Sequence, residues 1–363
     1  MRILIVKLSS IGDVVHALPA ASLLRRAIPF AHISWVVERR ASAILKDSPV
    51  IDLLIEIDTR AWRRRWSKIE TVGEIRSLIN GLRESDNGID IAIDFQGLIK
   101  SGLVALVSGA GRRIGFETGE LRERASRIFL TEQVETSSFA HVIEKNLALA
   151  RAAIGSSGGS GSSLPVASAP FEFPIAVSPE DEQYIDIAVA QTAGRFAIIN
   201  PGGGWPTKLW PASAYGEIAD WLAREYNLTS FITYGPGEEV LAKEVASSAR
   251  ADRARLLATT LKQFVALARR ASLFVGGDTG PLHLAAASGT PIVGLYGPTA
   301  PERNGPFDRR DLSLGRDLWC REGCHRRSCW HWECMAIPVS AVMRAISKRL
   351  ALSERETQWV SDR

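Results

Sequence analysis

Short apolar runs alternate with stretches of helical periodicity along the chain, and this alternation limits the fold more than any other feature. The predicted strands Arg2–Lys7, Ile33–Val37 and Phe196–Asn200 have continuously apolar interiors, without the apolar–polar alternation of a half-exposed strand. Continuous apolar strands are typical of parallel sheets that helices cover on both faces. We therefore expect an α/β protein built from parallel units.

The same reading places further elements on both sides of the middle of the chain. Strands are also predicted at Ile51–Ile55, Ile89–Ile93, Ser230–Tyr234, Leu273–Gly276 and Ile292–Tyr296. Helices are predicted at Asp13–Arg26, Ile69–Leu82, Leu98–Val107, Ala212–Tyr226, Glu238–Ser248 and Gly280–Ser288.

A run of nine Gly and Ser residues, Gly155–Ser163, divides the two halves. Such a segment buries too little apolar surface to offset its ordering entropy, which predicts a flexible linker. The expected organisation is a first Rossmann-like domain over 1–154, a linker over 155–178 and a second Rossmann-like domain over 179–340. A tail over 341–363 is expected to pack back on the first domain. Two such domains are expected to leave a cleft that binds ligands.

With 46% hydrophobic and 23% charged residues, the 363-residue chain has the composition of a globular protein. No apolar run approaches the roughly 18 residues of a membrane span, and we expect a cytoplasmic protein. Basic residues crowd the first 130 positions: Arg39, Arg40, Arg63, Arg64, Arg65, Lys68, Arg112, Arg113, Arg122, Arg124 and Arg127. They indicate either solvated faces or a surface for a polyanionic acceptor or an anionic membrane. Nucleic acid is not expected, because no binding motif accompanies them.

The segment Val275–Leu284 reads Val-Gly-Gly-Asp-Thr-Gly-Pro-Leu-His-Leu and has the features of a diphosphate site. A strand ends at two glycines, and Pro281 sits near the start of the helix that follows, where its missing N–H has no helical partner. The free N–H groups of Thr279, Gly280 and Leu282, together with the helix dipole, would hold an anion. The competing interpretation is an ordinary helix cap by the side chain of Asp278 or Thr279.

Two more loops follow apolar strands in the same half. Asn200–Lys208 contains three successive glycines with a lysine at its end, which favours phosphate contact over a plain turn. Neither a Walker pattern nor Gly-x-Gly-x-x-Gly is present. In Tyr234–Glu238, the carboxylate of Glu238 is predicted either to hold ribose hydroxyls or merely to begin a helix.

Asp13 follows the first strand in Ser-Ser-Ile-Gly-Asp and is the candidate general base. A carboxylate at a helix start stays ionised and can take the proton of an attacking hydroxyl. It is also a common residue in a first helical turn, and His16 is the alternative base. No Asp-x-Asp metal motif is present, so we expect metal-free chemistry with one base.

All four cysteines lie close together near the end of the chain, beside His325 and His331. They are Cys320, Cys324, Cys329 and Cys334. Their spacing is not the usual Cys-x-x-Cys of a zinc site, which leaves a structural metal and reduced, packed thiols as alternatives.

These motifs together resemble the ADP-heptose:lipopolysaccharide heptosyltransferases of glycosyltransferase family 9, which have the GT-B fold. The resemblance runs over nearly the whole chain and rests on segments 2–13, 94–100, 113–116, 277–283 and 296–299. It implies inverting transfer of L-glycero-D-manno-heptose from ADP-heptose to the Kdo/heptose inner core of lipopolysaccharide, an anionic glycolipid at the inner membrane. The start of the chain resembles heptosyltransferase I, whereas the cysteine segment resembles heptosyltransferase II.

The resemblance also implies roles for particular residues. The catalytic base falls on Asp13. Donor-binding residues fall on Lys208, Thr207, Asp278, Thr279, Gly280, His283 and Glu238. Acceptor-binding residues fall on Ser10, Gly12, Arg63, Arg64, Gln96 and Lys100. No cofactor is implied. The rival hypotheses are a nucleotide-sugar 2-epimerase of the same fold and an inactive nucleotide-sugar-binding protein.

Overall fold

The computed structural model describes residues 1–64, 73, 81, 88–139, 141–155, 171–190, 192, 194–320, 324, 328–329 and 333–361. They form two compact units, Met1–Ala176 and Val177–Arg363. The predicted helix 69–82, most of the Gly/Ser linker, and the residues His325 and His331 lie outside the described residues.

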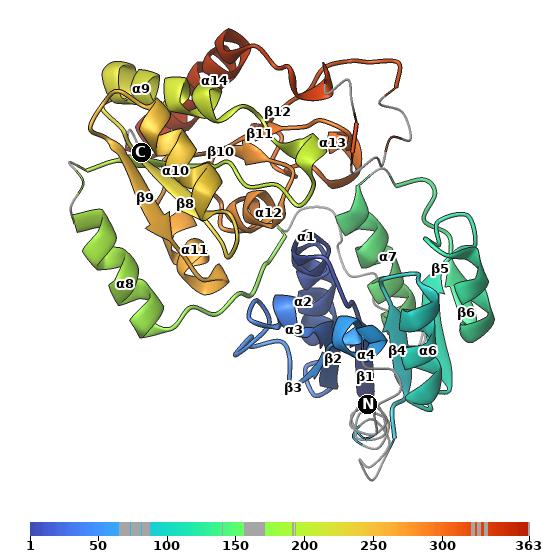
Figure 1. Ribbon diagram of the computed structural model, residues 1–363. Coiled ribbons are helices and arrows are strands. Elements are labelled where there is room, and N and C mark those ends of the chain that lie inside the picture. The colour runs from blue at the N-terminus through green and yellow to red at the C-terminus, as the bar shows by residue number, and fades with distance from the viewer. Residues whose placement is uncertain are drawn as a thin grey trace. The chain divides into compact units, whose positions relative to one another are not determined.

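The first unit is built on a six-stranded parallel sheet in the order β3-β2-β1-β4-β5-β6 (Figure 1). Its strands are β1 (Arg2–Val6), β2 (His32–Glu38), β3 (Leu53–Ile57), β4 (Ile91–Asp94), β5 (Arg112–Phe116) and β6 (Glu132–Val134). Its helices are α1 (Ile11–Val15), α2 (Leu18–Ala27), α3 (Arg39–Ser42), α4 (Thr59–Arg64), α6 (Ile99–Val107), η1 (Arg124–Phe129) and α7 (Val142–Gly155).

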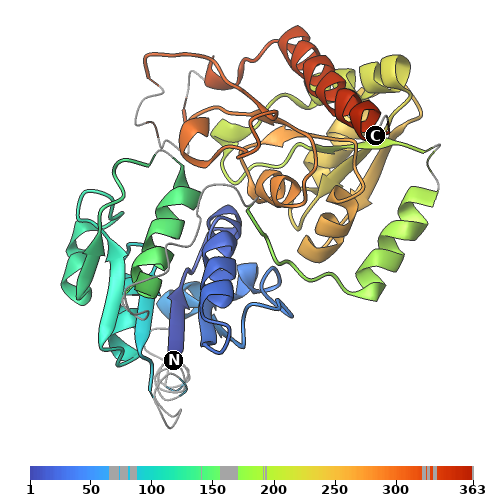
Figure 2. The ribbon, with the colours of Figure 1, turned by 180° about the vertical axis from the view of Figure 1, so that it is seen from behind.

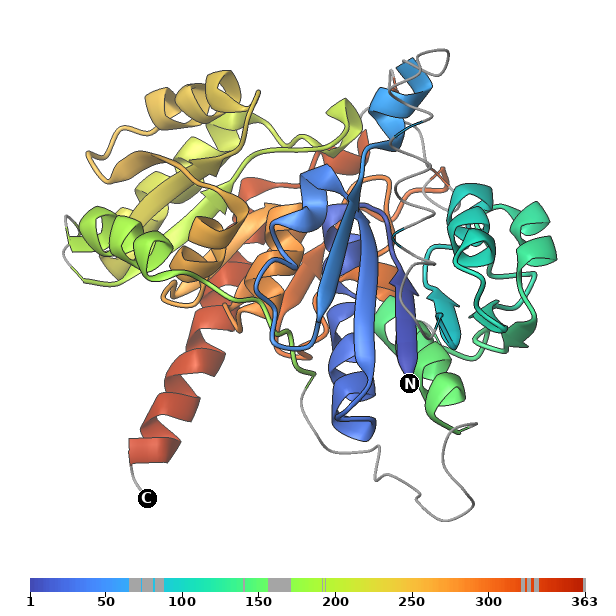
Figure 3. The ribbon, with the colours of Figure 1, turned by 90° about the horizontal axis from the view of Figure 1, so that it is seen from below.

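The central strand β1 is buried on both faces. Leu4 and Val6 pack with Val104 of α6, while α2 and α7 pack together against the other side of the sheet (Figure 3). The predicted single helix Asp13–Arg26 is wrong in one respect, because it is two helices. Pro19 lacks the N–H that would continue the first helix, and α2 starts anew around it.

The second unit repeats the plan with a six-stranded parallel sheet in the order β12-β11-β10-β7-β8-β9 (Figure 2). Its strands are β7 (Phe196–Asn200), β8 (Thr229–Tyr234), β9 (Ala254–Ala258), β10 (Leu273–Gly277), β11 (Ile292–Leu295) and β12 (Leu312–Leu314). Its helices are α8 (Pro179–Ala190), η2 (Pro206–Lys208), α9 (Ala212–Tyr226), α10 (Glu239–Ser248), α11 (Leu261–Ala268), α12 (Gly280–Ala287), α13 (Pro301–Asn304), η3 (Glu333–Met335) and α14 (Val339–Ser361).

Both sheets have the same topology, and the α/β fold class predicted from the sequence is confirmed. Counted from its own first strand, each sheet has the doubly wound order 3-2-1-4-5-6. In such sheets ligands bind beyond the carboxyl ends of the strands where the order reverses. These points lie beyond β1 and β4 in the first unit and beyond β7 and β10 in the second.

The last helix, α14, packs on α9, β11 and β12 within the second unit. That it also packs on the first domain stays a prediction. Among the helices of the described residues, none has the length and apolar character needed to cross a lipid bilayer.

One ion pair fastens α14 to the second sheet. Arg349 Nε donates to Asp311 Oδ1 at 2.7 Å, and both side chains are buried. The same oxygen accepts the N–H of Ile292 at the start of β11. Burial outweighs these partners and raises the pKa of Asp311 to about 6.

Replacing Arg349 with Met should leave the Asp311 carboxylate buried without its cation and lower the free energy of unfolding by about 3–5 kcal/mol at pH 8. The raised pKa of Asp311 favours the folded state at low pH and opposes it as pH rises through about 6. Without Arg349 the pKa of Asp311 rises further, so more of the carboxyl group is neutral at pH 5. The loss in the free energy of unfolding should therefore be smaller at pH 5 than at pH 8. Urea denaturation at pH 8 and at pH 5 measures the two losses. The control is Arg344→Met on the exposed face of the same helix; an equal loss at both pH values would contradict the argument.

Candidate functional site

In the first unit, the loops that follow β1 and β4 are joined to each other. Gln96 Oε1 accepts the N–H groups of Leu8 and Ser9 at 3.1 and 3.2 Å. Lys7 Nζ, which is buried, donates to the carbonyl of Phe95 at 2.5 Å. Gln96, predicted to bind the acceptor, is itself buried and directs its amide oxygen at the backbone of the β1 loop. In this structure the hydrogen bonds of Gln96 fix the loop that leads to Asp13.

Asp13 lies in the first turn of α1, at the carboxyl end of the central strand. Ser10 donates to Asp13 Oδ2 from both its N–H, at 2.8 Å, and its hydroxyl, at 3.1 Å. Arg122 Nη2 reaches Asp13 Oδ1 at 2.9 Å from the loop after β5. The carboxylate keeps 16% of its surface exposed, so it is held in place but open to solvent.

The surroundings of Asp13 keep it ionised. Its partial burial would raise its pKa, but the positive charges of Lys7 and Arg122 and the Ser10 N–H outweigh that effect and hold the pKa well below its usual range. Asp94, at the end of β4, shows the opposite balance. It accepts two N–H groups and the Ser101 hydroxyl, yet complete burial raises its pKa to about 6. Of the two carboxylates, only Asp13 is partly exposed, and its lowered pKa keeps it ionised and able to accept a proton from a hydroxyl that contacts it.

The structure brings some of the predicted acceptor residues together and separates others. Ser10 and Gly12 lie in the Asp13 turn. Lys100 lies on α6, where its ammonium donates to Glu38 Oε1 at 3.1 Å and to Thr59 Oγ1 at 3.2 Å. Arg64 is exposed on α4, and the side chain of Arg63 lies outside the described residues.

In the second unit, the carboxylate of Asp278 joins four elements. It is almost fully buried and accepts from Lys208 Nζ at 2.6 Å, Thr299 Oγ1 at 2.6 Å and Asn304 Nδ2 at 3.0 Å. His283 Nε2 lies 3.2 Å from Asp278 Oδ1. Although burial opposes charge, His283 and Lys208 hold the pKa of Asp278 far below its usual range. Lys208 also donates to the Asp278 carbonyl at 2.9 Å, which fixes the lysine beside the start of α12.

Glycines allow the loops of the second unit to touch. A Cβ on Gly202 would lie 2.3 Å from Glu238 Oε1, because the Glu238 carboxylate occupies the space beside that glycine. Glu238 Oε2 also accepts the N–H of Gly235 at 3.1 Å. A Cβ on Gly277 would lie 3.3 Å from the carbonyl of Lys208. The loops after β7, β8 and β10 thus converge, and they carry Glu238, Lys208 and Asp278.

The start of α12 is not capped by a side chain. Thr279 is the N-cap residue, but no side-chain hydrogen bond caps the helix, and the Asp278 carboxylate is engaged by the donors described above. The buried Thr279 Oγ1 has no hydrogen-bond partner among the described residues. Gly280 is the first helical residue and Pro281 the second. The competing interpretation of an ordinary side-chain cap is therefore wrong, because no side chain occupies the place of the cap at the start of α12.

Four residues that contact or stabilise the two carboxylates were not predicted as site residues: Lys7, Arg122, Thr299 and Asn304. Arg122 was noticed only as part of a basic cluster, because it lies 109 residues from Asp13. Thr299 follows the motif Tyr-Gly-Pro, and Asn304 ends α13, but nothing in their local pattern indicates that they contact Asp278. The parallel order of the strands could have indicated these contacts, because the loops after neighbouring strands meet at one edge of a parallel sheet.

Much of the basic surface predicted in the first unit has structural partners. Arg112 forms a bidentate pair with Glu132, and Arg113 donates to the carbonyls of Phe129 and Ala110. The four cysteines are free thiols, and burial with the neighbouring thiols raises the pKa of Cys334. Within the described residues, no group of three or more His, Cys, Asp or Glu side chains is placed to hold a metal.

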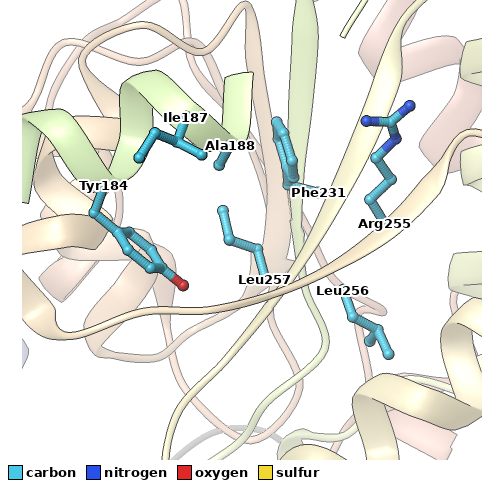
Figure 4. A pocket seen from close by; sticks show the side chains of 7 residues that line it. All are labelled: Tyr184, Ile187, Ala188, Phe231, Arg255, Leu256 and Leu257. Carbon is cyan, nitrogen blue, oxygen red and sulfur yellow. The ribbon is translucent and has the colours of Figure 1, made fainter. Parts of the chain in front are cut away.

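A separate cavity of about 780 Å³ lies between α8 and the edge of the second sheet (Figure 4). It is lined by Tyr184, Ile187, Ala188, Phe231, Arg255, Leu256 and Leu257. The hydroxyl of Tyr184 already donates to the carbonyl of Ala258 at 2.9 Å. None of the predicted site residues that the structure describes lines this cavity, which separates it from the loops around Asp278.

The model of glycosyltransferase family 9 (heptosyltransferase) matches residues 75–331. The chain therefore belongs to glycosyltransferase family 9, and it is a glycosyltransferase.

Individual heptosyltransferases are also similar to this chain. The chain is 29% identical to lipopolysaccharide heptosyltransferase 1 of Pseudomonas aeruginosa, over 91% of this chain and 87% of that protein. It matches the solved structure of the E. coli heptosyltransferase WaaC with ADP at a TM-score of 0.77 and 26% identity, covering 96% of this chain and all of the other. The same enzyme with ADP-2-deoxy-2-fluoro heptose gives a TM-score of 0.76 at 25% identity, over 96% and 99% of the two chains. The family resemblance seen in the sequence is confirmed.

The close approach of Gly202 and Glu238 predicts a specific stability effect. Gly202→Ala should lower the free energy of unfolding by only about 0.5–1.5 kcal/mol, because the new methyl group displaces the flexible end of Glu238 and breaks its hydrogen bond to the Gly235 N–H. In a Glu238→Ala background Gly202→Ala should cost little, since the carboxylate and its hydrogen bond are then absent. A double-mutant cycle from denaturation curves measures the coupling. Gly204→Ala is the matched control, because no atom lies within 4 Å of its Cβ position; additive effects of Gly202→Ala and Glu238→Ala would show that the two loops do not touch.

Proposed function

We propose that this glycosyltransferase transfers L-glycero-D-manno-heptose from ADP-heptose to the Kdo/heptose inner core of lipopolysaccharide by a single, inverting displacement. The observation that carries the proposal is an exposed carboxylate, Asp13, which Lys7 and Arg122 hold in its charged form at the carboxyl end of a central strand. The names of the similar proteins, a lipopolysaccharide heptosyltransferase and a heptosyltransferase with ADP or an ADP-heptose analogue, support the substrate class.

The second unit supplies the donor site in this proposal. The diphosphate of ADP-heptose binds at the uncapped start of α12, where Gly280 and Leu282 offer N–H groups and the helix dipole favours an anion. An ammonium has three N–H donors. Two of those of Lys208 are engaged by the carbonyl and carboxylate of Asp278, and the third is directed to a phosphate oxygen. Glu238, which lies against the Gly202 loop, accepts ribose hydroxyls, while Thr207 and His283 complete the pocket.

The first unit supplies the base. Asp13 takes the proton of an acceptor hydroxyl while that oxygen forms a bond to the anomeric carbon of heptose. The bond from this carbon to the ADP oxygen breaks on the opposite face, and ADP leaves with the electron pair. Attack opposite to the leaving group inverts the configuration. Lys208 and the start of α12 stabilise the negative charge that develops on ADP, so the proposal needs neither a metal nor another cofactor.

Acceptor binding is assigned to the basic side of the same unit. Ser10 and Gly12 border Asp13, and Arg122 is placed to shift from Asp13 to an acceptor carboxylate or phosphate. Arg63, Arg64 and Lys100 add positive charge from α4 and α6. An acceptor of this kind is anchored in lipid, so we propose that the enzyme works peripherally on the cytoplasmic face of the inner membrane.

The proposal predicts a separation of binding from catalysis in Asp13→Asn. The amide keeps the shape of the side chain but cannot take a proton, so kcat should fall by about 10²–10⁴-fold, whereas the Kd for ADP should stay unchanged. ADP release with a truncated core acceptor measures kcat, and calorimetry measures the Kd. Asp58→Asn is the control, since Asp58 Oδ1 accepts the N–H of Ala61 at the start of α4 and Asn can do the same. Transfer by Asp13→Asn at a rate near that of the wild type would reduce Asp13 to a helix-capping residue.

A further inference from the structure

Helix α6 in the first unit exposes an apolar stripe. Ile99, Leu103 and Leu106 are spaced i, i+4 and i+7, which places them on one side of the helix. Their side chains are 45%, 47% and 41% exposed, whereas Val104 and Ala105 on the opposite side are buried against the sheet. Helix α6 thus has apolar residues on both its buried and its exposed side, which an ordinary surface helix does not.

The 3-10 helix η1 extends this stripe. It packs beside α6 (Figure 3). The ring of Phe129 fills the space beside Gly102. Ile128, the neighbour of Phe129, is 78% exposed. We call Ile99, Leu103, Leu106 and Ile128 the α6–η1 face. Exposed apolar groups gathered on two packed elements are characteristic of an interaction surface.

Cations border the α6–η1 face. Arg124 and Arg127 of η1 are exposed, and neither has a carboxylate partner among the described residues. Arg127 Nε donates to the neutral Gln133. Of the nearby acidic groups, Glu120 is paired with Lys145 at 2.5 Å, and Glu123 Oε2 accepts the N–H of Ile99. Accepting an N–H does not neutralise the Glu123 carboxylate, so the two arginines and the one glutamate of residues 123–127 leave one positive charge along this edge.

The face is also continuous with the loop that holds Asp13. Glu123 N–H donates to the carbonyl of Gly97, and Ile99 N–H donates to Glu123, so the start of α6 is fixed to residues 122–123. Arg122 of that loop reaches the Asp13 carboxylate. A surface that contacts the α6–η1 face therefore lies beside the base.

From this geometry we infer that the α6–η1 face docks on an anionic lipid bilayer, with its apolar side chains inserted at the headgroup boundary and with Arg124 and Arg127 on lipid phosphates. The inference rests on the proposed function in that a lipid-anchored acceptor lies in such a surface. An apolar stripe flanked by arginines is the pattern of an interfacial element, and the arginines match the charge of an anionic leaflet. A purely apolar protein partner would leave these two cations unmatched.

Two double variants of the full chain test the inference. Leu103→Ser with Ile128→Ser removes apolar contact, and Arg124→Gln with Arg127→Gln removes charge. None of these residues belongs to the proposed catalytic or binding machinery. The controls are Ile187→Ser with Val240→Ser, which are 61% and 71% exposed in the second unit, and Arg224→Gln on the exposed side of α9. Thermal unfolding checks that each variant is folded.

Binding is measured by sedimentation with vesicles of phosphatidylethanolamine and phosphatidylglycerol, at low salt. The arginine variant should bind about 25-fold more weakly, since each cation near an anionic surface contributes roughly fivefold. The serine variant should lose at least tenfold, and the controls should bind like the wild type. Replacing phosphatidylglycerol with phosphatidylcholine should abolish the difference between the arginine variant and the wild type.

Transfer assays separate this inference from the proposed function. Both double variants should transfer to a water-soluble, delipidated acceptor at the wild-type rate and more slowly to an acceptor in vesicles. Vesicle binding unchanged in both variants would overturn the inference, as would a loss of self-association without lipid in the serine variant, which would make the face a contact between copies. A wild-type protein that binds vesicles but transfers heptose to neither acceptor would count against the proposed function alone.

Discussion

The second unit depends on one buried carboxylate. Burial opposes a charge on Asp278. The carboxylate stays ionised because four side chains donate hydrogen bonds to it: Lys208, His283, Thr299 and Asn304. These donors come from different loops, so satisfying one charge draws the loops after β7, β10 and β11 together. The start of α12 is then left without a side-chain cap. The uncapped helix start on which the proposed donor site depends is therefore a consequence of the hydrogen bonds that Asp278 makes.

In the first unit, the charge of a carboxylate is stabilised in a different way. Asp13 follows the first strand of its sheet and Asp278 the fourth strand of the other, so both lie where the strand order reverses, but Asp13 is partly exposed and needs fewer partners. Lys7 is buried beneath it and Arg122 lies beside it, so its charge is stabilised while one face stays accessible. A shared topology therefore places a carboxylate at the reversal point of each sheet. Burial then separates the two carboxylates, because Asp278 is enclosed by its donors whereas Asp13 keeps part of its surface exposed.

Sequence reasoning recovered those parts of the structure that depend on local pattern. Continuously apolar strands gave both sheets, and α9 was predicted with the bounds that the structure shows. The strands β5, β6, β9 and β12, which lie at or next to the edges of their sheets, were not predicted, because their sequences are only partly apolar. The same limit applies to the site. Asp13, Lys208 and Asp278 stand in recognisable motifs, whereas Arg122 and Asn304 act only through contacts made by folding. The roles assigned to these residues remain predictions.

The pH dependence of kcat/KM for heptose transfer tests the role of Asp13 most directly. A carboxylate whose pKa lies well below its usual range is already ionised, so we expect kcat/KM to stay level as pH falls from about 8 to about 5. The other candidate base is His16, one turn further along the chain and buried. A loss of kcat/KM with an apparent pKa of about 6.5 that disappears in His16→Asn would show that the imidazole takes the proton, and it would contradict the account given for Asp13.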